Sequence, residues 1–129
     1  EMPAIALLDR NGVYGAPRFH MEGQRRGVRA HIGAEIGVSD MGQRLRPASY
    51  LPHLHPIEPL RLPLLVESRT GYQNLCRLVT RFKLRESTKT EGAAFTSDFE
   101  EYGEGLVCLT GGSEGPLAAA LAGGGYDAA

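Results

Sequence analysis

Apolar residues along the chain gather in short segments whose spacing alternates between that of strands and that of helices. The first segment, Ala4 to Leu8, is continuously apolar and ends at Asp9, just before a turn that contains an Asn-Gly pair. A run of this length between such boundaries is typical of a buried strand. Residues 16–26 then predict a short helix that ends near Gly27.

The second strand is predicted over residues 28–38, where every other position is apolar. The alternating positions are Val28, Ala30, Ile32, Ala34, Ile36 and Val38. Glu35 falls on the opposite face, together with Arg29 and His31. A strand, a short helix and a second strand within about 35 residues predict a βαβ unit, with parallel strands and a right-handed crossover.

The middle of the chain begins with a loop over residues 39–59, which contains several prolines. Leu60 to Val66 predicts a third strand, and Pro63 within it favours an edge position or a bulge. A longer helix follows, with Thr70 as its N-cap and Gln73 completing a capping box. An apolar stripe at helical spacing is expected to face the core: Tyr72, Leu75, Cys76, Val79 and Phe82.

The last part of the chain predicts a helix, a strand and a second helix. Ser97 to Glu100 forms a second capping-box pattern, which predicts the start of a short helix. Residues 105–112 predict a fourth buried strand closed by two glycines. Ser113 is expected to cap a final helix with Pro116 in its first turn and residues 117–122 as its body. The whole pattern predicts an α/β protein with a parallel sheet.

The composition fits one domain, or a piece of one, with enough apolar residues for a core. The net charge is −1, so no overall basic signal points to nucleic acid. Residues 1–89 nevertheless hold all 14 bases and 8 of the 15 acids, which leaves 7 acids and no base in the rest. This basic portion could meet phosphates, but a solvated surface balanced by the acidic tail is the favoured interpretation.

Two cysteines, Cys76 and Cys108, both lie in apolar segments. Buried free thiols are the default there, and they favour a cytosolic protein over a disulfide scaffold. No apolar run approaches the roughly 20 residues that a membrane helix needs. The chain begins with Glu1 just before a strand, which is the pattern expected of a fragment whose beginning is missing.

Asp9 and Glu35 are the candidate site residues, because both are expected near the ends of neighbouring parallel strands. Two carboxylates placed in this way could hold a divalent metal or share a proton transfer. Zinc or manganese, however, usually takes three or more protein ligands. The favoured alternative is that these are surface or turn acids, with Asp9 accepting hydrogen bonds from the turn that follows it.

Three other patterns do not support a catalytic role. His53 and His55 lie between prolines in the loop, where surface histidines are more common than metal ligands. Residues 111–115 match the letters of the G-x-S-x-G nucleophile elbow, but that arrangement needs a later His and none follows His55. An N-cap role explains Ser113 adequately. Cys76 lies on the core stripe with no His near it in sequence, which disfavours a nucleophile.

The chain nevertheless resembles one family, the PHP (polymerase and histidinol phosphatase) domain. Three stretches carry the resemblance: Ala6–Gly15, Ile32–Glu35 and Leu64–Leu75. They are most similar to the amino-terminal PHP domain of bacterial C-family DNA polymerases, the DNA polymerase III alpha subunit. Residues 71–80 and 105–112 point to the error-prone alpha-like branch. The resemblance implies a distorted (β/α)7 barrel with parallel strands, of which residues 1–129 form a partial PHP domain, without the first H-x-H strand and the later barrel strands.

The resemblance also implies a metal cluster at the carboxyl ends of the strands, which this sequence matches only in part. The family's Asp-His motif reads Asp9-Arg10 here, and the motif glutamate matches Glu35. A further family His would fall near Arg61 or Pro63, where no ligand is present. Arginine cannot coordinate a metal. Only Asp9 and Glu35 are therefore carried over as metal ligands, in a degenerate site where Arg10 pairs with Asp9 or Glu35 in place of the ions.

The function implied is that of an amino-terminal fragment of an error-prone DNA polymerase, in which the PHP domain is a structural platform for DNA synthesis of the translesion or repair type. The fragment alone would then be inactive and would need no cofactor. Zinc or manganese would bind only at the degenerate site, whereas magnesium would serve the parent polymerase. DNA and other replication or repair proteins are the expected partners, in the cytoplasm and away from membranes. The alternatives are a metal-dependent PHP phosphoesterase and a piece that is only marginally folded.

Overall fold

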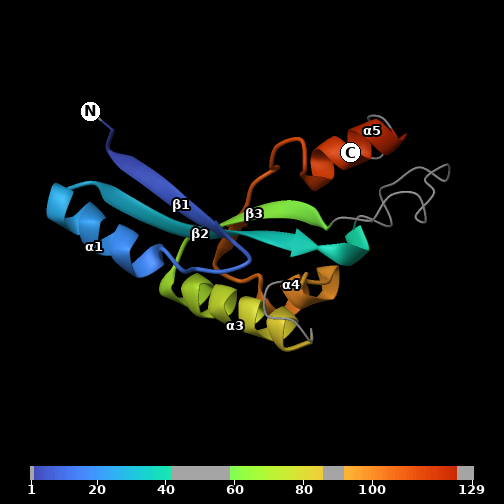
Figure 1. Ribbon diagram of the computed structural model, residues 1–129, viewed down its shortest axis with the longest axis horizontal. Helices are drawn as coiled ribbons and strands as arrows, with labels where there is room; N and C mark the ends of the chain where they lie inside the picture. Colours follow the sequence, from blue (N-terminus) through green and yellow to red (C-terminus); the bar gives the residue numbers. More distant parts are fainter. Residues whose placement is uncertain (1, 42–58, 86–91, 125–129) are drawn as a thin grey trace.

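The computed structural model describes residues 2–41, 59–85 and 92–124 as an α/β arrangement around one mixed sheet (Figure 1). The named elements, in chain order, are β1 (Ala4–Arg10), α1 (Ala16–Arg26), β2 (Arg29–Val38), β3 (Leu60–Val66), α3 (Arg69–Arg85), α4 (Thr96–Tyr102), β4 (Leu106–Cys108) and α5 (Pro116–Gly124). None of the helices in this part of the chain is long and apolar enough to cross a bilayer.

The four strands lie in the order β1-β2-β3-β4. β1 and β2 are parallel, as the βαβ pattern predicts, but β3 is antiparallel to β2 and β4 is antiparallel to β3. The prediction of an all-parallel sheet is therefore wrong. Along the chain, two helices, α3 and α4, connect β3 to β4. In the sheet, Leu106 at the start of β4 pairs with Val66 at the end of β3. The (β/α)7 barrel stays a prediction, since the described strands form an open sheet.

The first three elements follow the sequence closely. α1 has the predicted bounds, with Pro17 in its first turn and Gly27 in the left-handed conformation (φ 64°) at its end. Both features are the usual boundary signals of a helix. β1 runs two residues further than predicted, so Asp9 and Arg10 are part of the strand and not of the turn.

The hydrophobic core lies on one face of the sheet. In Figure 1, α1, α3 and α4 lie on one side of the sheet and α5 lies on the other. The buried cluster comprises Ala34, Ile36, Val38, Leu62, Leu64, Leu75, Leu78, Phe82 and Ala94. The alternating positions of β2 and β3 supply one layer, and α3 supplies the layer that covers it, as expected for a sheet with one apolar face.

The start and the buried face of α3 differ from the prediction. Ser68, not Thr70, is the capping residue, because its hydroxyl accepts a hydrogen bond from the Gly71 amide at 3.1 Å. Tyr72 is exposed, whereas Asn74 and Leu78 are buried. The buried face is rotated toward Gly71 and Asn74, which carry no apolar signal in the sequence. The buried face of α3 is therefore displaced to one side of the predicted apolar stripe.

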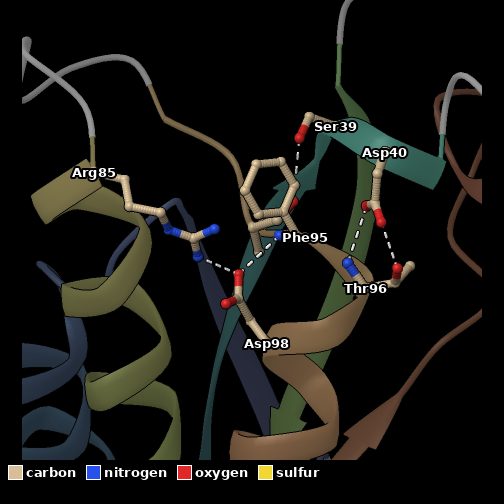
Figure 2. Close-up of polar contacts among 7 residues, drawn as sticks. Ser39, Asp40, Arg85, Phe95, Thr96 and Asp98 are labelled. Carbon is tan, nitrogen blue, oxygen red and sulfur yellow. Dashed lines mark hydrogen bonds and ion pairs between the residues drawn. The ribbon is translucent and has the colours of Figure 1, made fainter.

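Polar contacts hold the start of α4 to the surrounding elements (Figure 2). The Asp98 carboxylate accepts a hydrogen bond from the Phe95 amide at 2.8 Å and forms an ion pair with Arg85 of α3. The Asp40 carboxylate, just beyond β2, accepts hydrogen bonds from the amide (2.9 Å) and the hydroxyl of Thr96. The N-cap is thus Phe95, two residues before the predicted cap Ser97, and the Asp98 side chain reaches back to its amide.

The strand predicted over residues 105–112 is shorter and more exposed than expected. β4 has three residues, Val107 and Cys108 are exposed, and both cysteines are free thiols. The prediction of two buried thiols is therefore wrong for Cys108. β4 is the last strand at that edge of the sheet.

Pro63 does not place β3 at the edge, since β3 lies between β2 and β4. Its carbonyl oxygen accepts a hydrogen bond from the Leu109 amide at 2.9 Å. In an antiparallel ladder the N–H and C=O of one residue point the same way, so the missing N–H lies on the β4 side. β4 proper ends at Cys108, whose partner is Leu64, so no ladder bond is lost there.

Ser113 does not cap the last helix. α5 starts at Pro116, and the carbonyl of Gly115 accepts the first helical hydrogen bond from Ala119 at 3.1 Å. Ser113 belongs to the turn before it, which is closed by a 3.0 Å bond from the Gly115 amide to the Gly112 carbonyl. Pro116 lies in the first turn, as predicted, and there it occupies the first helical position.

Candidate functional site

Asp9 lies one residue from the end of β1 and anchors the start of α1. Its Oδ2 accepts a hydrogen bond from the amide of Gly15, the residue before the helix, at 2.6 Å. A carboxylate at this place also interacts favourably with the positive end of the helix dipole. The Asp9 carboxylate therefore accepts a turn hydrogen bond, as the favoured alternative expects, although the donor is Gly15 and not the three residues directly after it.

The strand register places the two candidate acids on opposite faces of the sheet. Asp9 pairs with Ala34, which is buried in the core, whereas Arg10 pairs with Glu35. Paired residues of neighbouring strands share a face, and consecutive residues alternate between faces. Asp9 therefore faces the helices that cover the core, while Glu35 faces the other side together with Arg10.

Four charged residues meet on that second face, and we call them the four-charge cluster. Its members are Arg10 of β1, Glu35 of β2, Arg61 of β3 and Glu114 of the turn before α5. Arg10 Nε lies 3.2 Å from Glu35 Oε2, and its terminal nitrogen lies 3.8 Å from Glu114 Oε2. Arg61 Nε lies 3.9 Å from the same Glu114 oxygen. The cluster links three strands and one turn through alternating charges.

Burial within the four-charge cluster is uneven. The side chains of Arg61 and Glu35 are 25% and 28% exposed, whereas those of Arg10 and Glu114 are 67% and 66% exposed. Water screens exposed ion pairs, so each contact is expected to contribute no more than about 1 kcal/mol. The Arg61 amide also donates a 2.8 Å hydrogen bond to the Glu114 carbonyl, which fixes the turn against β3.

The residues of this face do not fit a divalent metal. Asp9 faces the opposite side of the sheet, and the Glu35 carboxylate already lies against the guanidinium of Arg10, whose charge opposes a cation. Within residues 2–41, 59–85 and 92–124, no three Asp, Glu, His or Cys side chains are grouped as metal ligands. The histidines His53 and His55 lie outside the described residues.

Asn11 is the residue that sequence reasoning missed. Its amide donates to the Glu35 carbonyl at 2.9 Å, and its side-chain oxygen accepts from the Gly37 amide at 2.9 Å. Its side-chain nitrogen donates to the Gly92 carbonyl at 3.1 Å, and its φ is 48°. Asparagine tolerates this left-handed conformation better than most residues, so the Asn-Gly pair was the available signal. Asn11 ties the end of β1 to β2 and thereby holds Arg10 beside Glu35.

The two cysteines and Ser113 offer no activated nucleophile. Partial burial raises the pKa of the Cys108 thiol, which lowers the fraction of reactive thiolate at neutral pH. Cys76 is partly buried on α3, and its backbone carbonyl accepts a 2.8 Å hydrogen bond from the hydroxyl of Thr80. Ser113 is exposed in the turn before α5.

Comparison with known proteins shows what this chain is similar to. All of residues 1–129 match the family model described as PHP domain. An error-prone DNA polymerase of Anaeromyxobacter sp. (strain K) is 35% identical over 128 residues, which cover 93% of this chain and 10% of that protein. The DNA polymerase III subunit alpha of Caulobacter vibrioides (strain NA1000 / CB15N) is 31% identical over 124 residues, covering 96% and 10%.

A second DNA polymerase III subunit alpha, from Vibrio cholerae serotype O1, is 29% identical over 122 residues, which cover 93% of this chain and 9% of that protein. The chain therefore spans about a tenth of the length of the curated relatives that it matches.

Proposed function

The chain belongs to the PHP domain family, and from that premise we propose that it is part of the amino-terminal PHP domain of an error-prone DNA polymerase. The similarity to a relative of that name, 35% identical, supports this branch over the DNA polymerase III alpha subunits at 29% and 31%. The parent protein would carry out DNA-directed DNA synthesis of the translesion or repair type, in the cytoplasm. DNA would be its main partner, beside other replication or repair proteins.

The role proposed for this domain is that of a structural platform with a degenerate metal site. The observation that carries the proposal is the 3.2 Å contact between Arg10 and Glu35. Glu35 is the remnant of the ligand set on the face of Arg10, which is the cation that replaces the ions. Asp9, the other ligand that the family resemblance carries over, faces the opposite side and holds the start of α1. Magnesium for DNA synthesis would be bound by other parts of the parent polymerase.

The physical basis of this role is that a metal cluster and a charge cluster can both tie the ends of strands together. A metal does so through shared ligands, and the four-charge cluster does so through alternating guanidinium and carboxylate groups. Arg10 in place of a neutral ligand removes the Lewis acid that hydrolysis of a phosphate ester would need. The fold is then retained while the hydrolytic chemistry is lost.

A hydrolysis assay distinguishes the platform from a metal-dependent phosphoesterase. With added Mn²⁺ or Zn²⁺, the chain is expected to cleave p-nitrophenyl phosphate no faster than its Glu35→Gln variant, because Glu35 does not act as a metal ligand. The variant keeps the size of the side chain and removes only its charge. Metal-dependent cleavage by the original chain that disappears in Glu35→Gln would instead establish the phosphoesterase.

The parent polymerase is tested separately by the complete gene. A reading frame that continues for many hundreds of residues beyond Ala129 supports the polymerase. A stop codon shortly after it, together with an upstream H-x-H pair, supports the free-standing phosphoesterase.

A further inference from the structure

α3 is a strongly basic element in a chain whose net charge is −1. Its 17 residues include no acid. Its basic residues are Arg69, Arg77, Arg81, Lys83 and Arg85. A helix of this length extends about 25 Å, and the i,i+4 spacing of Arg77, Arg81 and Arg85 puts these three cations along one side of it. The positive potential of this surface is therefore local to α3.

Two of these cations are occupied by contacts within the fold. Arg85 pairs with Asp98 and lies over the Phe95 ring at 4.5 Å. Lys83 contacts the hydroxyl of Tyr14 and lies 4.8 Å from the centre of its ring. The cations that remain are Arg69, Arg77 and Arg81.

Arg77 and Arg81 occupy a solvent-exposed face of α3, one helical turn apart. Within the part of the chain that the structure describes, neither forms an ion pair with a carboxylate. Arg77 donates a 3.3 Å hydrogen bond to the side-chain oxygen of Asn74, which is buried, and this contact orients its guanidinium. Within the described residues, two neighbouring guanidinium groups are thus presented to solvent without an ion-pair partner.

A shallow groove of ≈340 Å³ lies along the same face. It is lined by Cys76, Arg77, Thr80, Arg81, Leu84 and Tyr102. Hydrogen bonding to Glu101 raises the pKa of Tyr102, and Arg81 and Arg77 oppose that rise through their positive charge. Both guanidinium groups are therefore close enough to Tyr102, which lines the groove, to influence its hydroxyl. Glu101 of α4, the partner of Tyr102, is an acid beside the groove.

We propose that this face of α3 binds the phosphodiester backbone of a nucleic acid through Arg77 and Arg81. The guanidinium fork matches phosphate oxygens in two-point hydrogen bonds, and adjacent forks suit a polymer with regularly repeated charges. Leu84, which is largely exposed, offers apolar contact to a sugar or a base. The inference goes beyond the proposed function and does not rest on it, since a basic groove binds phosphates whether or not the metal site is lost.

The test measures binding of the 129-residue chain to a fluorescently labelled 20-base-pair DNA duplex and to the corresponding single strand, over a range of salt concentrations. The variant is Arg77→Gln with Arg81→Gln. The matched control, Arg25→Gln with Arg26→Gln, removes the same charge from the exposed last turn of α1. Circular dichroism establishes that each protein is folded.

The original chain is expected to bind nucleic acid at low salt, and the α3 variant is expected to lose about tenfold in affinity. Its plot of log K against log salt should become shallower by about 1.8 for the duplex, because each lost phosphate contact removes about 0.9. The control should change neither quantity by more than a fraction of this. Equal loss in variant and control, no binding at low salt, or equally tight binding of a polyglutamate chain would overturn the proposal, the last in favour of an acidic protein partner.

Discussion

Replacing Gly71 by alanine is expected to lower the free energy of unfolding by more than about 3 kcal/mol, or to prevent folding altogether. A Cβ atom at this position would lie 1.8 Å from the carbonyl oxygen of Gly105. That oxygen also accepts a 3.0 Å hydrogen bond from the Glu67 amide, so the clashing atom belongs to backbone that is held in place by this bond. The start of α3 would have to move away from the segment that leads into β4. Urea unfolding followed by circular dichroism measures the loss.

Gly112→Ala is the matched control for this prediction. No atom lies within 4 Å of a Cβ built at Gly112, and its φ is not in the left-handed region. The same chemical change should therefore alter stability by less than about 0.5 kcal/mol. Equal effects of the two substitutions would show that the contact between Gly71 and Gly105 is not as close in solution as the structure has it.

The second large effect is expected at Asp98. Its side chain is 8% exposed, caps α4 through the Phe95 amide and pairs with Arg85 of α3 (Figure 2). Asp98→Ala removes the cap and leaves the guanidinium unpaired, which should lower the free energy of unfolding by about 2–4 kcal/mol. The lower part of this range is favoured because Arg85 is 30% exposed and can be partly hydrated. Chemical denaturation measures the change.

Glu100→Ala on the same helix is the comparison for Asp98→Ala. Glu100 is exposed, and its replacement should change stability by less than about 0.5 kcal/mol. Asp98→Asn should fall between the two, because the amide keeps an oxygen for the Phe95 amide but loses the charge. If Asp98→Ala proved as mild as Glu100→Ala, the contacts between α3 and α4 would not be a source of stability.

Local signals in the sequence predicted the first elements well and the later ones less well. The bounds of α1 and the alternation in β2 follow from Gly27 and from period-two spacing, which act within one element. The cap of α3 was misassigned because Thr70 and Ser68 are both capable of capping, and packing of Gly71 against Gly105 decides between them. The exposure of β4 depends on its place at the sheet edge, which only the strand order gives.

The candidate site could be predicted as residues but not as an arrangement. The sequence and the family resemblance picked out Asp9, Arg10 and Glu35, and Arg10 does pair with Glu35, which was one of the two partners considered. Which acid faces Arg10 depends on the strand register, and that register is a property of two strands together. Glu114 joins the cluster from a distant turn, and nothing in its local sequence indicates its charge partners.

We propose that Arg10 and Glu35 stand where a metal would otherwise be bound. Metal analysis of the chain, purified without chelators and measured by inductively coupled plasma mass spectrometry, tests it most directly. Zinc, manganese and iron are expected far below one ion per chain, both in the original protein and in Glu35→Gln. Tightly held zinc or manganese in stoichiometric amount, lost on replacing Glu35, would contradict it.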